Sequence, residues 1–205
     1  MSYDRAFWEQ LWAKTLREHP DKVAQRPPNA HLVAALAPLA PGRALDAGCG
    51  HGAETLWLAA HGWEVTAVDF SAQALAHAQA TAAVLGGDVA ARINWVEADL
   101  GVWAPPRDRF DLVACLYVHI AGSVDAMVRR MASAVAPGGV LLMAGHRPID
   151  PATREPTAAA GQVQVSVEAT IAALAPDAWE LVIAEERPRA ITGAGVDAVI
   201  LARRV

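Results

Sequence analysis

Short apolar runs alternate with longer, helically patterned segments through the middle of the chain. The short runs predict strands over residues 43–48, 64–70, 93–99, 110–118 and 140–145, and the 64–70 run is β-branched. Between them, apolar residues recur every three or four positions, which predicts helices over 53–62, 71–87 and 123–139. Strands that are apolar on both faces and alternate with amphipathic helices are typical of a parallel sheet with helices on both sides.

The N-terminal pattern is purely helical. Residues 4–18 repeat apolar positions at helical spacing, with charged residues on the other side. A proline-containing linker follows, and Asn29 is placed to cap a second helix over 30–40. Ser71 and Gly86 are the expected N-cap and C-cap of the helix over 71–87.

The C-terminal part changes rhythm. Residues 146–161 are rich in proline and lack periodicity, which predicts a long loop. Ser166 is placed to cap a further helix, and the apolar runs 179–189 and 196–205 flank a glycine-containing turn. This arrangement predicts a hairpin, so the sheet is expected to end with an antiparallel strand.

Composition narrows the class of protein. The chain has 205 residues, 54% of them hydrophobic, and a net charge of −5, which suits one domain with a core and argues against nucleic-acid binding. The N-terminus lacks the pattern of a secretion signal, and no apolar stretch is long enough for a membrane span. The two cysteines, Cys49 and Cys115, have neither disulfide-framework nor metal-ligand spacing, so we expect reduced thiols, no metal and a cytoplasmic location.

The stretch "LDAGCGHGAETLWLA" carries the first candidate chemistry. Gly48, Gly50 and Gly52 lie between the first strand of the alternating series and its helix, at the carboxyl edge where open α/β sheets bind ligands. The turn predicts a nucleotide-like cofactor and also satisfies the dinucleotide pattern, with Asp69 at the distance of a ribose-binding acid. Asp46 opposes a pyrophosphate and favours a ligand with a positively charged end.

Five motifs in this order carry a family resemblance: "ALDAGCGHG", "VTAVDFS", "VEADL", "FDLVACLYVHI" and "APGGVLLMAG". Over roughly residues 30–145 they resemble the class I S-adenosylmethionine-dependent methyltransferases. Within that superfamily the chain is most similar to small bacterial enzymes of the tellurite-resistance and thiopurine-methyltransferase-like branch. The expected fold is a Rossmann-like three-layer α/β sandwich, with a mostly parallel seven-stranded sheet and a C-terminal antiparallel hairpin.

The expected organisation is a single methyltransferase domain over 1–205. Residues 1–29 form an N-terminal helix and linker that cover the site, and 30–145 form the cofactor-binding core. Residues 146–162 form a loop or lid, and 163–205 form a helix and the terminal hairpin. The oligomeric state is not readable from the sequence.

The resemblance implies how S-adenosylmethionine, or its product S-adenosylhomocysteine, is bound. Gly48, Cys49 and Gly50 line the methionine part through backbone groups, and Asp46 faces its amino group. We interpret the Cys49 thiol itself as a small filler.

The other cofactor contacts follow the later strands. Asp69 accepts the ribose hydroxyls and Phe70 packs beside the adenine, whose edge is read by Asp99 and the Leu100 backbone. The end of the 110–118 strand lies near the sulfonium and contributes Cys115 and Leu116.

Candidate acceptor residues carry alternative interpretations. His119 is the candidate general base and Tyr117 a positioner, although a surface or capping role for His119 fits equally well. His146 and Arg147 are suited to an anionic acceptor or to a solvated loop. Trp8 and Trp12 close over the site or pack the first helix on the sheet.

The resemblance implies methyl transfer to an oxygen, nitrogen or sulfur atom of a small-molecule acceptor. An NAD-dependent oxidoreductase shares the glycine pattern, but Asp46 and the missing Tyr-x-x-x-Lys pair count against it. A catalytically silent S-adenosylmethionine-binding protein is the third hypothesis.

Overall fold

The computed structural model describes residues 5–19, 23, 25–120, 122–149, 153–156, 164–188 and 195–205. The chain divides into two compact units, residues 1–103 and 104–205, and each is described by itself. The described residues contain no helix that is long and apolar enough to cross a membrane.

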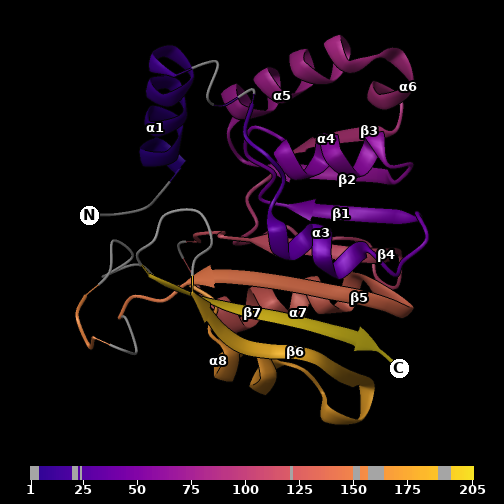
Figure 1. Ribbon diagram of the computed structural model, residues 1–205, viewed down its shortest axis with the longest axis vertical. Coiled ribbons are helices and arrows are strands. Elements are labelled where there is room, and N and C mark those ends of the chain that lie inside the picture. The colour runs from indigo at the N-terminus through magenta and orange to yellow at the C-terminus, as the bar shows by residue number, and fades with distance from the viewer. Residues whose placement is uncertain are drawn as a thin grey trace. The chain divides into compact units, whose positions relative to one another are not determined.

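The first unit is a three-stranded parallel sheet with helices (Figure 1). Its elements are α1 (Arg5–Glu18), α3 (Ala30–Leu36), β1 (Arg43–Ala47), α4 (Ala53–Ala60), β2 (Glu64–Asp69), α5 (Ala72–Leu85), α6 (Gly87–Ala90) and β3 (Ile93–Glu97). The strand order is β3-β2-β1, and Asp69 and Glu97 are register partners at the carboxyl ends of β2 and β3. The short helix α6 was not predicted by the hydrophobic pattern.

Helix boundaries in this unit follow from capping side chains. The side chain of Asn29 accepts a hydrogen bond from the backbone of His31, and that of Ser71 from the backbone of Ala74, so both predicted N-caps are confirmed. Gly86 ends α5 with a φ of +134°, as predicted for a C-cap.

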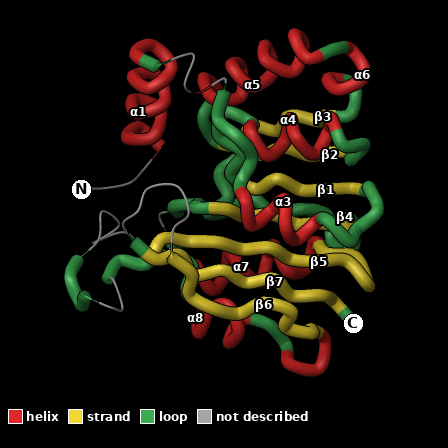
Figure 2. The backbone as a smooth tube through the Cα atoms, viewed as in Figure 1, coloured by secondary structure: helices red, strands yellow, loops and turns green. Residues whose placement is uncertain are grey.

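The second unit holds four strands (Figure 2). Its elements are β4 (Phe110–Leu116), α7 (Val124–Ala134), β5 (Val135–His146), α8 (Val167–Ala173), η1 (Pro176–Ala178), β6 (Trp179–Pro188) and β7 (Val196–Arg204). The order is β4-β5-β7-β6; β4 and β5 are parallel, whereas β7 is antiparallel to both β5 and β6. With the first unit this makes the predicted seven-stranded mixed sheet with a C-terminal antiparallel hairpin, so the fold class is confirmed.

One predicted boundary is wrong. The helix expected over 123–139 ends at Ala134, and β5 begins at Val135 rather than at Val140. Pro137 has no N–H to donate and disfavours helical backbone at the residue before it, so the chain leaves the helix early. The run from Val135 therefore joins the strand, with a register irregularity opposite the start of β4.

Parts of the predicted C-terminal loops lie outside the described residues. Residues 150–152 and 157–162 of the 146–162 segment, residue 163 and residues 189–194 around the hairpin turn are among them. Within the described part of the first segment, Ile149 and Pro156 form an isolated antiparallel bridge. The extent of the domain remains a prediction.

Candidate functional site

The glycine turn between β1 and α4 is held against the end of β2. Gly48, Gly50 and Gly52 have φ values of +84°, +51° and +86°, which L side chains rarely adopt. The N–H groups of Gly48 and Cys49 both donate to the carbonyl oxygen of Val68, at 2.8 and 3.0 Å. The positive φ expected of these glycines is present in the structure, and their close approach to a cofactor stays a prediction.

Asp69 ties the glycine turn to the start of α5. Its Oδ2 accepts from the N–H of Gly50 at 2.9 Å, and its Oδ1 accepts from the N–H of Ser71 at 2.9 Å. The residue is only 8% exposed, and burial raises its pKa. Each carboxylate oxygen has two lone pairs, so both oxygens keep capacity for a hydroxyl donor.

Asp46 is a buried carboxylate at the end of β1. The residue is 3% exposed, and its Oδ2 accepts from the hydroxyl of Thr55 at 2.5 Å. Burial, and next the neighbouring Glu54, raise the pKa of Asp46 to about 7. Sequence reasoning found Asp46 but missed Thr55 and Glu54, which lie in the first turn of α4. They could have been predicted near Asp46, because α4 begins directly after the glycine turn.

Helix α1 covers the glycine turn with an aromatic side chain. The indole of Trp12 lies so near Gly50 that an added Cβ would be 2.8 Å from Cζ2. The ring of Trp12 also lies 5.4 Å, centroid to centroid, from that of His51 in the same turn. α1 has no buried residue, and both interpretations of Trp12 stay predictions.

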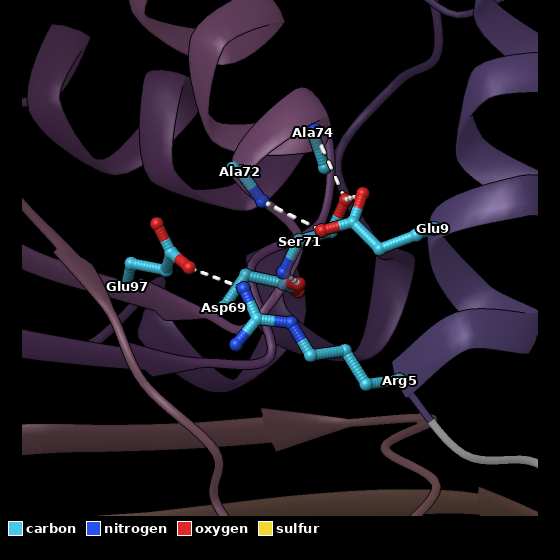
Figure 3. Close-up of polar contacts among 7 residues, drawn as sticks. All are labelled: Arg5, Glu9, Asp69, Ser71, Ala72, Ala74 and Glu97. Carbon is cyan, nitrogen blue, oxygen red and sulfur yellow. Dashed lines mark hydrogen bonds and ion pairs between the residues drawn. The ribbon is translucent and has the colours of Figure 1, made fainter.

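Two charged residues attach α1 to the same edge (Figure 3). Glu9 accepts from the hydroxyl of Ser71 at 2.9 Å and from the N–H of Ala72 at 3.1 Å, at the N-terminus of α5. Arg5 forms an ion pair with Glu97 at the end of β3. Both side chains reach toward the place where Asp69 ends β2. Sequence patterning did not single out these residues, because their partners are 62 or more positions away.

The remaining predicted adenine contacts are spread over the loops after β2 and β3. Phe70 is half-buried and Leu100 is buried. Asp99 is exposed, and its Oδ1 accepts from the N–H of Gly101 at 2.7 Å in a local turn. Trp8, also predicted near the site, is half-buried and packs edge-on against Phe7.

The second unit gathers the predicted acceptor residues near the ends of β4 and β5. Cys115 is buried and Leu116 is half-buried. Tyr117 follows β4 with a φ of +56°, an uncommon value outside glycine. His119 is half-buried; burial, and then the nearby His146, lower its pKa to about 4. A base with that pKa is neutral at pH 7 but binds a proton weakly.

His146 forms a three-residue cluster that the sequence did not predict. Its ring stacks on Tyr117 with centroids 4.3 Å apart, and its Nδ1 lies 2.8 Å from Oδ1 of Asp197. The hydroxyl of Tyr117 donates to Oδ2 of Asp197 at 2.9 Å. Arg147 pairs with Glu186 at 2.5 Å, so its charge is balanced within this unit. Asp197 could have been noticed in the sequence, because it is the one charged residue in the otherwise apolar run "VDAVIL" and such a buried acid needs a partner.

Neither cysteine is placed for nucleophilic chemistry. Cys49 and Cys115 are buried, and burial raises the pKa of the Cys49 thiol well above its ordinary value. The described ranges hold no group of three or more His, Cys, Asp or Glu side chains that could hold a metal ion.

The region that contains the glycine turn, the acids after β2 and β3, and β4 matches a known family. Residues 44–139 match the family model described as a methyltransferase domain. The predicted resemblance to the class I S-adenosylmethionine-dependent methyltransferases is confirmed, whereas the tellurite-resistance and thiopurine-methyltransferase-like branch stays a prediction.

Two curated methyltransferases illustrate the likeness in sequence. Ribosomal RNA small subunit methyltransferase C of Alcanivorax borkumensis is 33% identical over 138 residues, which are 63% of this chain and 40% of the relative. Trans-aconitate 2-methyltransferase of Paracidovorax citrulli is 33% identical over 135 residues, 63% of this chain and 48% of the relative. The chain spans less than half the length of either relative.

The fold is shared along nearly the whole chain. The N-methyltransferase NodS from Bradyrhizobium japonicum, solved with S-adenosyl-L-homocysteine, has a TM-score of 0.70 over 96% of this chain and 97% of its own. The two are 20% identical, so this likeness establishes the fold of the methyltransferase domain.

Proposed function

We propose that this protein is an S-adenosylmethionine-dependent methyltransferase that acts on a small molecule in the cytoplasm. The observation that carries the proposal is the edge formed by β1 and β2. There a positive-φ glycine turn is held by Asp69, and a second carboxylate, Asp46, is buried beside it. The match of residues 44–139 to the methyltransferase domain supports the same activity.

The buried acid at this edge is complementary in charge to the amino group of S-adenosylmethionine. Within the described residues, the hydrogen bonds that Asp46 accepts come from neutral groups of Thr55, so nothing positive offsets its burial there. A cationic amino group would supply that missing charge, whereas a diphosphate would add repulsion. This is why we prefer methyl transfer to the nicotinamide alternative.

Individual roles in cofactor binding follow from position. Asp46 binds the amino group, and the backbone of Gly48, Cys49 and Gly50 lines the methionine part. Asp69 accepts the ribose hydroxyls with its remaining lone pairs.

The adenine is held by the loops after β2 and β3. Phe70 packs beside it, and Asp99 with the Leu100 backbone reads its edge. Helix α1, within the predicted covering segment, closes over the turn, because Trp12 lies over Gly50 and Glu9 attaches α1 to α5.

The acceptor side belongs to the second unit. When bound, the cofactor supplies a sulfonium-activated methyl group, so the protein needs to orient the acceptor, exclude water and receive a proton. Cys115 and Leu116 lie at the end of β4, and Tyr117, His119, His146 and Arg147 are the polar groups near this edge. An oxygen, nitrogen or sulfur acceptor of small size suits a protein with a net charge of −5 better than RNA does.

Calorimetric titration tests the cofactor directly. We expect S-adenosylhomocysteine to bind and NAD⁺ not to bind; NAD⁺ binding alone would overturn the proposal. Turnover is then measured as S-adenosylhomocysteine release with a thiol, a phenol, a carboxylic acid and a primary amine as acceptors. Cofactor binding with no turnover on any of these, or on an RNA duplex, would favour the catalytically silent alternative.

A further inference from the structure

The buried carboxylate of Asp197 joins two aromatic side chains from different parts of the second unit. Asp197 lies directly opposite His146 in the antiparallel β5–β7 pair. Its Oδ1 is 2.8 Å from Nδ1 of His146, and its Oδ2 accepts from the hydroxyl of Tyr117. Asp197 is 1% exposed, whereas the side chain of His146 is 27% exposed. The carboxylate is therefore inside and the imidazole reaches the surface of this unit.

The hydrogen bonds decide which nitrogen of His146 carries the proton. An ionised carboxylate can only accept, so the bond to Asp197 requires a proton on Nδ1 of His146. In the neutral ring this leaves Nε2 as the basic nitrogen. The second donor, Tyr117, helps to compensate the burial of the carboxylate and stacks on the ring at 4.3 Å, which limits its rotation.

His146 also lies at the right edge for catalysis. It is the last residue of β5, and β5 is parallel to β4, so it stands at the carboxyl end of these strands, where open α/β sheets bind ligands. His119 is the competing candidate from the sequence. Burial lowers the pKa of His119 to about 4, so its imidazole binds a proton only weakly at neutral pH.

We infer that Asp197 is a positioning residue that holds His146 as the general base for methyl transfer. The inference rests on the proposed function and adds the residue that receives the proton. As the acceptor atom forms its bond to the methyl carbon, the carbon–sulfur bond breaks and its electron pair stays on sulfur. Nε2 of His146 takes the acceptor's proton, and the imidazolium later releases it to water.

Several charged or titratable groups surround His146 and enter its pH dependence. Tyr117, His119 and Asp197 interact with His146 itself. Its chain neighbour Arg147 interacts with Glu186 of β6 and with Glu168 of α8, and Arg187 of β6 lies opposite Asp197 of β7. Arg147 is paired with Glu186, and Arg187 with Glu185, so Asp197 is the negative charge in direct contact with the ring.

Long-range proton–nitrogen NMR spectra of the protein with S-adenosylhomocysteine test the tautomer without an acceptor. We expect His146, assigned by its loss in His146→Gln, to show a protonated Nδ1 and a lone-pair Nε2 in its neutral form. Asp197→Asn replaces one accepting oxygen by an NH2 donor and removes the negative charge, so the fraction of neutral His146 protonated on Nδ1 should fall. A neutral wild-type His146 that is protonated on Nε2 would overturn the inference. This measurement is made on the wild-type protein, and His146→Gln is needed only to assign the signal.

Kinetics with the best acceptor of the panel test the base. We expect Asp197→Asn and His146→Gln to lower kcat about 100-fold at neutral pH, with the acceptor KM within about twofold. The acid limb of the kcat profile should vanish in His146→Gln and persist in His119→Gln; the opposite pattern would overturn the inference.

The matched control is Asp125→Asn, an exposed acid paired with Arg129 on α7, which should leave kcat unchanged. Calorimetry with S-adenosylhomocysteine separates the two proposals. If the wild-type protein does not bind S-adenosylhomocysteine, the proposed function is contradicted, whereas the tautomer of His146 is measured independently of that result.

Discussion

Trp12 lies directly over Gly50, with Cζ2 2.8 Å from the point where a Cβ would stand. The two residues are 38 positions apart (50 − 12) and belong to α1 and to the turn after β1. This contact joins a helix without buried residues to the glycine turn, which we propose as part of the cofactor-binding site. It also makes the turn intolerant of any side chain at this position.

Gly50→Ala should destabilise the protein for two separable reasons. The φ of +51° costs about 1 kcal/mol for an L residue, and the clash with Trp12 adds about 1–3 kcal/mol of overpacking. Urea unfolding measures the sum. In the Trp12→Ala background only the backbone cost should remain.

Gly138→Ala is the matched control for this pair. Its φ is +80° but nothing lies within 4 Å of its added Cβ, so it should show the backbone cost alone. Equal losses for Gly50→Ala and Gly138→Ala would mean that Trp12 yields freely.

Glu9→Ala should loosen α1. The substitution removes the acceptor for the hydroxyl of Ser71 and the N–H of Ala72, at a helix N-terminus where a carboxylate is favoured. We expect a loss of about 1 kcal/mol and faster tryptic cleavage after Lys14, followed by mass spectrometry. Glu18→Ala, at the exposed end of the same helix, should cleave at the wild-type rate. Identical rates for both variants would show that Glu9 does not anchor α1.

Asp46 predicts an unusual dependence of stability on pH. Its pKa is raised from 3.8 to about 7, so between these values the native state binds the proton that the unfolded chain has released. Stability should therefore fall as pH rises from about 4 to about 7 and then level off. Asp69 and Glu54 contribute in the same direction, because their pKa values are also raised.

Asp46→Asn isolates this contribution. The variant should flatten part of the fall in unfolding free energy, while Asp88→Asn, on the exposed surface of α6, should leave the slope intact. The affinity for S-adenosylhomocysteine should rise toward pH 7 in the wild type, because its cationic amino group favours the ionised carboxylate. A pH-independent affinity would contradict the assignment of Asp46 to the amino group.

Asp69→Asn should weaken cofactor binding. The amide keeps the shape of the side chain but offers one accepting oxygen instead of two, so it cannot serve both the turn and the ribose hydroxyls. We expect a loss of about 10–100-fold in affinity for S-adenosylhomocysteine by calorimetry. Unchanged affinity, at the level of Asp88→Asn, would show that Asp69 serves only to hold Gly50 and Ser71.

The sequence by itself determined the order of the elements and the resemblance to methyltransferases. Alternating apolar runs give the strands, because parallel strands are buried on both faces, and Asn29 and Ser71 cap their helices through contacts two or three residues away. The glycine turn with Asp46 and Asp69 is a local pattern and could be recognised for the same reason. The boundary at Ala134 was misjudged because helical periodicity outweighed the proline signal at Pro137.

Only the tertiary structure decided which distant residues meet. Asp197 reaches His146 through antiparallel register across 51 positions, and Trp12 reaches Gly50 because α1 returns to the turn after β1. It also decided which acids are buried: Asp46 and Asp69 carry raised pKa values, whereas Asp99 is exposed, although all three lie at or just beyond the carboxyl ends of strands. Packing and strand register depend on contacts between residues far apart in the chain, and these contacts cannot be predicted from local hydrophobic periodicity.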